Sequence, residues 1–85
     1  MTKINYKVKD EVGIHARPAG LLVKFVTGLS STVTMKKGDK GVDAKRLFGI
    51  MGLAVKCGDT VAFELDGANA AADAVALEKF CKENF

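Results

Sequence analysis

The sequence predicts a small α+β domain in which helices cover one face of an antiparallel β-sheet. Short segments with alternating apolar and polar residues, or with many β-branched residues, predict strands, whereas apolar residues recurring every three or four positions predict helices. At 85 residues the chain is expected to form a single domain, residues 1–85, with a modest core. The expected fold is an open-faced β-sandwich of order β-α-β-β-α-β-α, with a four-stranded sheet and three helices on one face.

The N-terminal segment, residues 3–9, is predicted to form the first strand. Its apolar residues alternate with lysine and asparagine, the pattern of a strand with one buried face: Ile4, Tyr6 and Val8. Residues 10–13 follow as a polar turn.

The first helix is expected at about residues 16–27. Pro18 indicates its start, because proline is tolerated in a helix only within the first turn. Gly28 is expected to end the helix in a left-handed conformation. Apolar residues recur at helical spacing over this segment: Ala19, Leu22, Val23, Phe25, Val26 and Leu29.

The middle of the chain predicts a hairpin and a short helix. Residues 32–36 are rich in β-branched side chains, and residues 37–41 join them to a short third strand at 41–43, so the two strands should pair antiparallel. Residues 47–55 are apolar almost throughout and are predicted to contain a short helix. Two glycines within it each weaken the helix by about 1 kcal/mol relative to alanine.

The C-terminal part predicts a fourth strand at residues 60–66 and a third helix after Asn69, which is suited to cap that helix. Glu78 and Lys82 lie four apart and should form an ion pair on the helix surface. The strand is expected to bury Val61, Phe63 and Leu65, and the helix Ala70, Ala74, Leu77 and Cys81.

Composition excludes several classes of function. A net charge of +3, with lysines scattered and not interleaved with aromatic residues, argues against nucleic-acid binding. Cys57 and Cys81 form no metal-binding motif, so free thiols, no metal site and no cofactor are expected. The N-terminal residues contain no apolar run, so neither a signal peptide nor a membrane association is expected, and the predicted location is the cytoplasm.

Candidate chemistry is concentrated at residues 13–20, which contain the only histidine, the only proline and one of two arginines. His15 directly precedes the expected helix. A phosphoryl group there would meet the positive end of the helix dipole, the free N–H groups of Ala16 and Arg17, and the guanidinium of Arg17. The same dipole favours the neutral, nucleophilic form of the imidazole. These residues alone are also compatible with a non-catalytic interaction module in which His15 only caps the helix.

Gly-Ile-His-Ala-Arg-Pro-Ala at residues 13–19 and Asp-Ala-Lys-Arg-Leu-Phe-Gly-Ile-Met-Gly-Leu at residues 43–53 resemble the two signatures of the HPr family, the phosphocarriers of the bacterial phosphoenolpyruvate-dependent sugar phosphotransferase system. The resemblance implies a carrier and not an enzyme. It implies that Nδ1 of His15 accepts the phosphoryl group from phospho-enzyme I and passes it to sugar-specific IIA proteins. Arg17 would neutralise charge during transfer, and Ala16 and Pro18 would position the site. A paralogue in a nitrogen-related or regulatory phosphotransfer chain is the alternative.

The resemblance also implies a docking surface on the second helix. Periodicity alone would place the whole apolar segment in the core. By resemblance we assign Leu47, Phe48 and Met51 to partner contacts, and Ile50, Leu53 and Ala54 to the core.

Arg46 is the main departure from the family pattern. Many relatives from Gram-positive bacteria carry a serine there that a kinase phosphorylates, and arginine has no hydroxyl to modify, so this control should be absent. Arg46 is either simply solvated or pairs with acidic groups on the partners. A monomer is expected.

Overall fold

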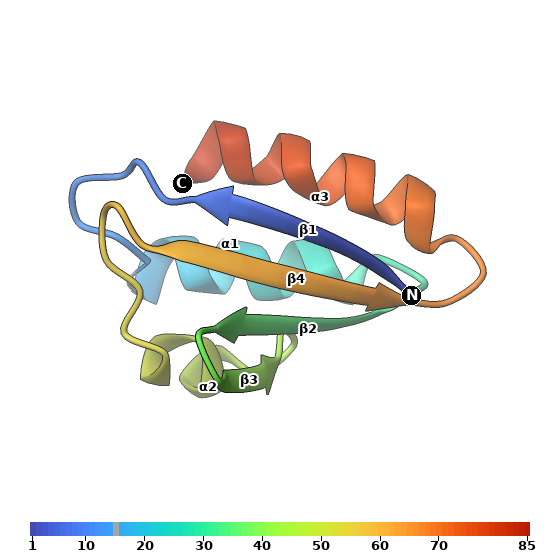
Figure 1. Ribbon diagram of the computed structural model, residues 1–85, viewed down its shortest axis with the longest axis horizontal. Helices are drawn as coiled ribbons and strands as arrows, with labels where there is room; N and C mark the ends of the chain where they lie inside the picture. The colour runs from blue at the N-terminus through green and yellow to red at the C-terminus, as the bar shows by residue number, and fades with distance from the viewer. Residues whose placement is uncertain (15) are drawn as a thin grey trace.

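The computed structural model describes residues 1–14 and 16–85, and in them it has the predicted order of elements (Figure 1). The fold class predicted from the sequence is confirmed. The strands and helices are β1 (Thr2–Lys7), α1 (Ala16–Thr27), β2 (Thr32–Lys37), β3 (Lys40–Asp43), α2 (Leu47–Gly52), β4 (Thr60–Asp66) and α3 (Ala70–Asn84).

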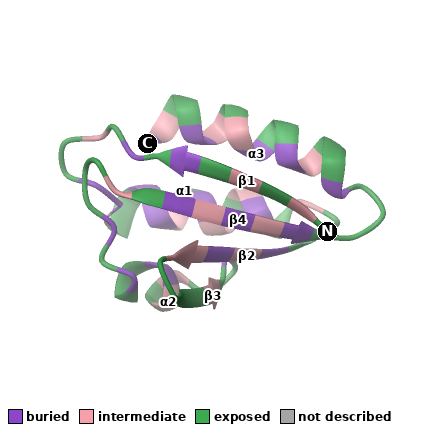
Figure 2. Cartoon of the chain, in the orientation of Figure 1, coloured by how far each residue is buried: buried purple, intermediate pink, exposed green. Residues whose placement is uncertain are grey.

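The four strands form one antiparallel sheet of order β1-β4-β2-β3. The register places Phe63 of β4 between Ile4 of β1 and Met35 of β2, so the apolar positions of the strands share one face. That face carries the helices, whereas exposed and half-buried residues alternate with buried ones along the strands and line the open face (Figure 2). The alternation predicted for residues 60–66 is confirmed, with Val61, Phe63 and Leu65 fully buried.

The apolar stripes of α1 and α3 complete the core. In α1 the residues Pro18, Ala19, Leu22 and Val26 are buried, and in α3 the predicted stripe of Ala70, Ala74, Leu77 and Cys81 is buried. Glu78 and Lys82 form the predicted ion pair, with 3.3 Å between Oε1 and Nζ.

The α1 helix ends at Thr27, directly before Gly28, as predicted, but Gly28 does not adopt the predicted left-handed conformation. It is absent from the glycines with positive φ in the described part of the chain. Instead, the N–H groups of Gly28 and Leu29 donate to carbonyl oxygens three residues earlier, at 3.1 and 3.0 Å, which tightens the last turn in the manner of a 3₁₀-helix.

Asn69 precedes α3, as predicted, but its side chain does not cap the helix. Its Nδ2 donates to Oγ of Ser30 at 3.2 Å. The start of α3 is joined to the rest of the fold by Asp73 in its first turn. Oδ2 of Asp73 accepts hydrogen bonds from N–H and Oγ of Ser31, at 3.1 and 2.6 Å, and from Oγ of Ser30 at 3.3 Å.

Ala54 does not lie in the core, contrary to the prediction. It is exposed and follows the end of α2 with φ +51. Its carbonyl oxygen accepts a hydrogen bond from Nζ of Lys37 at 2.9 Å. The positive φ turns the side chain of Ala54 towards solvent, while Leu53 and Val55 on either side stay buried.

Candidate functional site

The N-terminal end of α1 is the centre of the candidate site. His15 lies outside the described residues, so its role as cap and nucleophile stays a prediction. The helix begins at Ala16, and Pro18 is buried in its first turn, as predicted. That turn, described in full from Ala16 on, carries no acidic side chain. No carboxylate of the helix itself therefore neutralises the positive end of its dipole.

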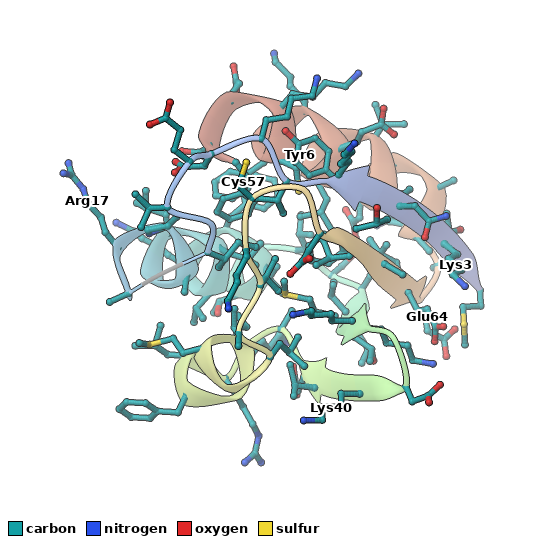
Figure 3. The ribbon with its side chains drawn as sticks, turned by 60° about the vertical axis from the view of Figure 1, so that its left-hand side comes forward. Lys3, Tyr6, Arg17, Lys40, Cys57 and Glu64 are labelled. Atoms are coloured by element: carbon teal, nitrogen blue, oxygen red, sulfur yellow. The ribbon has the colours of Figure 1, made fainter. Side chains whose placement is uncertain are left out.

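Arg17 is exposed, and Figure 3 shows its side chain extending from the start of α1 away from the body of the protein. It borders a shallow hollow of about 360 Å³, whose other lining residues are Asp10, Pro18, Leu21 and Asn84. The hollow thus brings the turn before α1, the first turns of α1 and the end of α3 to one place. An exposed guanidinium here can reach an anion that approaches the start of the helix.

Gly13 has a structural role that the sequence did not reveal. It is buried, with φ +78. A Cβ at this position would lie 2.4 Å from the carbonyl oxygen of Val55. The next residue, Ile14, donates its N–H to the same oxygen at 3.0 Å. Gly13 therefore lets the turn before α1 pack directly against the backbone that follows α2.

The turn around Lys56–Asp59 supports this packing. The carboxylate of Asp59 accepts hydrogen bonds from the N–H of Lys56, at 2.9 Å, and pairs with Nζ of Lys37, at 3.0 Å. The hydrogen bond from the N–H of Lys56, and to a smaller extent that from Lys37, holds the pKa of Asp59 below its ordinary value.

The α2 helix lies beside α1 and presents apolar side chains to solvent (Figure 1). Phe48 is 84% exposed and Met51 37% exposed, whereas Ile50 and Leu53 are buried, as predicted. Leu47 is half-buried and packs against the core, so only part of its side chain is available to a partner. Arg46 is exposed and directly precedes α2, and its side chain makes no capping hydrogen bond to the helix.

Two further exposed apolar residues near the start of α1 were not singled out from the sequence. Val12 is 69% exposed and Leu21 is 45% exposed. The helical period could have identified Leu21 as exposed. At 100° per residue it lies on a different side of α1 from the buried residues Ala19 and Leu22. Val12 carried no such signal, since a turn has no repeating pattern.

Residues 1–14 and 16–85 contain no cluster of three or more histidine, cysteine, aspartate or glutamate side chains that could hold an ion. Of the two thiols, Cys57 is exposed and Cys81 is buried, and neither forms a disulfide.

A family model described as the phosphorylation site of the PTS HPr component matches residues 2–83, nearly the whole chain. The chain belongs to the HPr family. Members of this family are phosphocarriers of the phosphotransferase system, and the resemblance stated from the two sequence signatures is confirmed.

Curated and solved relatives agree with this assignment. The phosphocarrier protein HPr of Mycoplasma capricolum is 34% identical over 70 residues, which cover 82% of this chain and 79% of the relative. The crystal structure of HPr-C-His from Thermoanaerobacter tengcongensis matches with a TM-score of 0.92 at 33% identity, covering 100% of this chain and 96% of that one.

A crystal structure of an HPr dimer from the same organism matches with a TM-score of 0.75 at 32% identity, covering 98% of this chain and 95% of that one. Because some solved relatives are described as dimers, the expectation of a monomer stays a prediction for this chain. Among the helices formed by the described residues, none combines the length and apolar character needed to cross a membrane.

Proposed function

We propose that this chain carries a phosphoryl group on Nδ1 of His15, accepting it from phospho-enzyme I and passing it to sugar-specific IIA proteins in the cytoplasm. The observation that carries the proposal is the start of α1 at Ala16, immediately after the histidine of the family motif, with no acidic residue in the first turn. A phosphoryl group at this helix end would be stabilised by the dipole and by free backbone N–H groups.

Arg17 is proposed to neutralise charge during transfer. As the P–N bond to the donor imidazole breaks and the bond to Nδ1 forms, negative charge is spread over the phosphoryl oxygens. The guanidinium can donate to two of these oxygens at once. Because Arg17 is exposed, the group stays accessible to the next acceptor.

The partners are proposed to dock on α2 and the adjoining start of α1. Phe48 and Met51 form an exposed apolar centre, and Arg46 adds a positive charge beside it. An exposed aromatic ring and a flexible thioether suit a surface that accepts several different proteins.

The direct test is incubation of the protein with phosphoenolpyruvate, Mg²⁺ and enzyme I, followed by mass spectrometry. We expect the mass of one phosphoryl group, labile to acid and stable to base, that is absent from His15→Ala. Arg17→Ala should accept the group about 100-fold more slowly, the size of effect seen when one donor to a developing charge is removed. No mass increase in the parent protein would refute the proposal.

A comparison of two variants tests the proposed role of Arg46. If it pairs with acidic groups on enzyme I, Arg46→Glu should raise KM for transfer and Arg46→Gln should have a smaller effect, because charge reversal adds repulsion to the lost attraction. Unchanged kinetics in both variants would leave Arg46 as a solvated residue.

A further inference from the structure

Phe85, the last residue of the chain, is held firmly in place at the end of α3. Its ring is buried and stands edge-on to Phe80, with centroids 5.8 Å apart at 84°. Phe80 in turn stacks on Phe25 of α1, at 4.5 Å and 19°. The N–H of Phe85 donates to the carbonyl oxygen of Cys81 at 2.8 Å, which extends the hydrogen bonding of α3 to this residue.

The fixed position of Phe85 matters because its backbone oxygen accepts two hydrogen bonds from the segment that leads to His15. The N–H groups of Lys9 and Asp10 both donate to it at 2.7 Å. These are among the shortest backbone hydrogen bonds that lie outside the helices and strands of the described residues. Lys9 and Asp10 lie beyond the end of β1, so the sheet does not supply their partners.

Asp10 is in turn hydrogen-bonded to the residues that follow it. Its Oδ1 accepts the N–H of Val12 at 2.9 Å, and its carbonyl oxygen accepts the N–H of Gly13 at 3.0 Å. Ile14 then donates to Val55. A continuous series of hydrogen bonds thus connects the end of α3 with Gly13, and the next residue, Ile14, is fixed separately by Val55. The hollow beside Arg17 also shows that the end of α3 lies close to this segment, since Asp10 and Asn84 both line it.

We propose that Phe85 is a positioning residue for phosphoryl transfer, acting through Lys9 and Asp10 on the segment before His15. This inference rests on the function proposed above. A nucleophile must be held within a narrow range of positions for in-line transfer, and a displacement of about 1 Å can lower the rate about 100-fold. The side chain of Phe85 is buried, so the proposed role is an indirect one.

The test compares Phe85→Ala with the parent protein in two measurements. Amide hydrogen exchange should become faster at Lys9 and Asp10, because the backbone oxygen of residue 85 that accepts their N–H groups is no longer held in place by the ring. The kcat for phosphoryl acceptance from phospho-enzyme I should fall by about 10- to 100-fold. KM should stay close to the parent value, since α2 is unchanged. Phe85→Tyr keeps the ring and should restore both readouts.

Val33→Ala is the matched control. Val33 is fully buried in β2, and its backbone forms no hydrogen bond with residues 9–14. Its truncation should therefore weaken the fold without releasing that segment. It should leave kcat and the exchange of Lys9 and Asp10 unchanged at a temperature where it is folded. An equal loss of kcat in Val33→Ala, or no loss in Phe85→Ala, would overturn the inference.

The experiment distinguishes failure of the proposed function from failure of the positioning role alone. If the parent protein accepts no phosphoryl group, the proposed function fails, while amide exchange still tests the restraint on Lys9 and Asp10. If the parent is phosphorylated and Phe85→Ala is phosphorylated equally fast, only the positioning role fails. Should Phe85→Ala not fold, Phe85→Leu, which keeps apolar bulk but lacks the ring edge, takes its place in the same measurements.

Discussion

Ala54 is the only residue other than glycine with a positive φ in residues 1–14 and 16–85. The left-handed conformation brings its Cβ close to the following carbonyl oxygen, which costs about 1–2 kcal/mol. The residue is exposed, so packing of its own side chain does not offset this cost. The hydrogen bond from Lys37 and the buried residues on both sides hold the backbone in this conformation.

Ala54→Gly should therefore stabilise the protein. Relief of about 1–2 kcal/mol of strain exceeds the added conformational entropy of an unfolded glycine, about 0.4–1 kcal/mol, so we expect a net gain of about 0.5–1 kcal/mol. Urea unfolding gives the free energy. Ala72→Gly is the control, because Ala72 is exposed in the regular helix α3 and should lose about 1 kcal/mol. Destabilisation by both variants would contradict the strain at Ala54.

The two cysteines should differ sharply in reactivity. Burial, with a smaller contribution from Glu78, raises the pKa of the Cys81 thiol to about 12. At pH 8 the native protein should react with a disulfide reagent at Cys57 alone, and at both thiols in denaturant. Absorbance and peptide mapping measure the two reactions. Equal native rates would contradict the burial of Cys81.

The same shift predicts a dependence of stability on alkaline pH. Above about pH 9 the thiol loses its proton in the unfolded chain but keeps it in the folded protein, so the unfolded state is favoured. The free energy of unfolding should fall as the pH rises from about 9 towards 12. Cys81→Ala should show a shallower fall.

At the scale of elements, the position of α3 depends on its first turn. Asn69, the residue expected to cap this helix, bonds to Ser30, and Asp73 accepts three hydrogen bonds from Ser30 and Ser31. Ser31 is almost completely buried. One carboxylate therefore satisfies buried polar groups of the segment between α1 and β2 and joins that segment to α3.

Asp73→Ala should lower the free energy of unfolding by about 1–3 kcal/mol, because it leaves the N–H and hydroxyl of Ser31 without this acceptor. Asp73→Asn, which keeps one oxygen, should lose less. Chemical unfolding provides the comparison, and Asp66→Ala, at an exposed position of β4, should stay within about 0.5 kcal/mol of the parent. A similar loss at both aspartates would argue against a specific role for Asp73.

Regular elements could be predicted from the sequence because their signals are local. The alternation at Val61, Phe63 and Leu65 and the stripe ending at Cys81 each follow from the period of one strand or one helix. The ends of elements were predicted less well. The backbone of Ala54 is held by Lys37 of β2, which no local pattern reports. Glycine adopts either sign of φ, so the sequence did not fix the conformation of Gly28.

At the scale of the whole molecule, the candidate site occupies one end. The start of α1, the end of α3 and the chain after β1 line one hollow there, and α2 packs against α1, whereas the start of α3 and the segment between α1 and β2 lie near the opposite end of the sheet (Figure 1). The sequence predicted the place of Arg17 through Pro18 and the motif. It did not predict the contributions of Gly13 and Phe85, because these depend on segments more than 40 residues away along the chain.

The separation of the proposed docking surface from the core allows a direct comparison within α2. Phe48→Ala should leave the free energy of unfolding within about 0.5 kcal/mol of the parent, because the ring is mostly in solvent, but should raise KM for phosphoryl acceptance from phospho-enzyme I. Ile50→Ala should cost about 2–5 kcal/mol of stability. Calorimetry and transfer kinetics on both variants separate the two roles, and unchanged kinetics for Phe48→Ala would remove Phe48 from the docking surface.

The contact between Gly13 and Val55 is made by backbone atoms, so it does not depend on which side chains α2 displays. Residues 48 and 51 can consequently be exchanged for others while the spacing between α2 and the segment before His15 is preserved. A library randomised at these two positions would then alter which proteins are recognised without disturbing the chemistry of the carrier, and would make this fold a starting point for rewired phosphate relays.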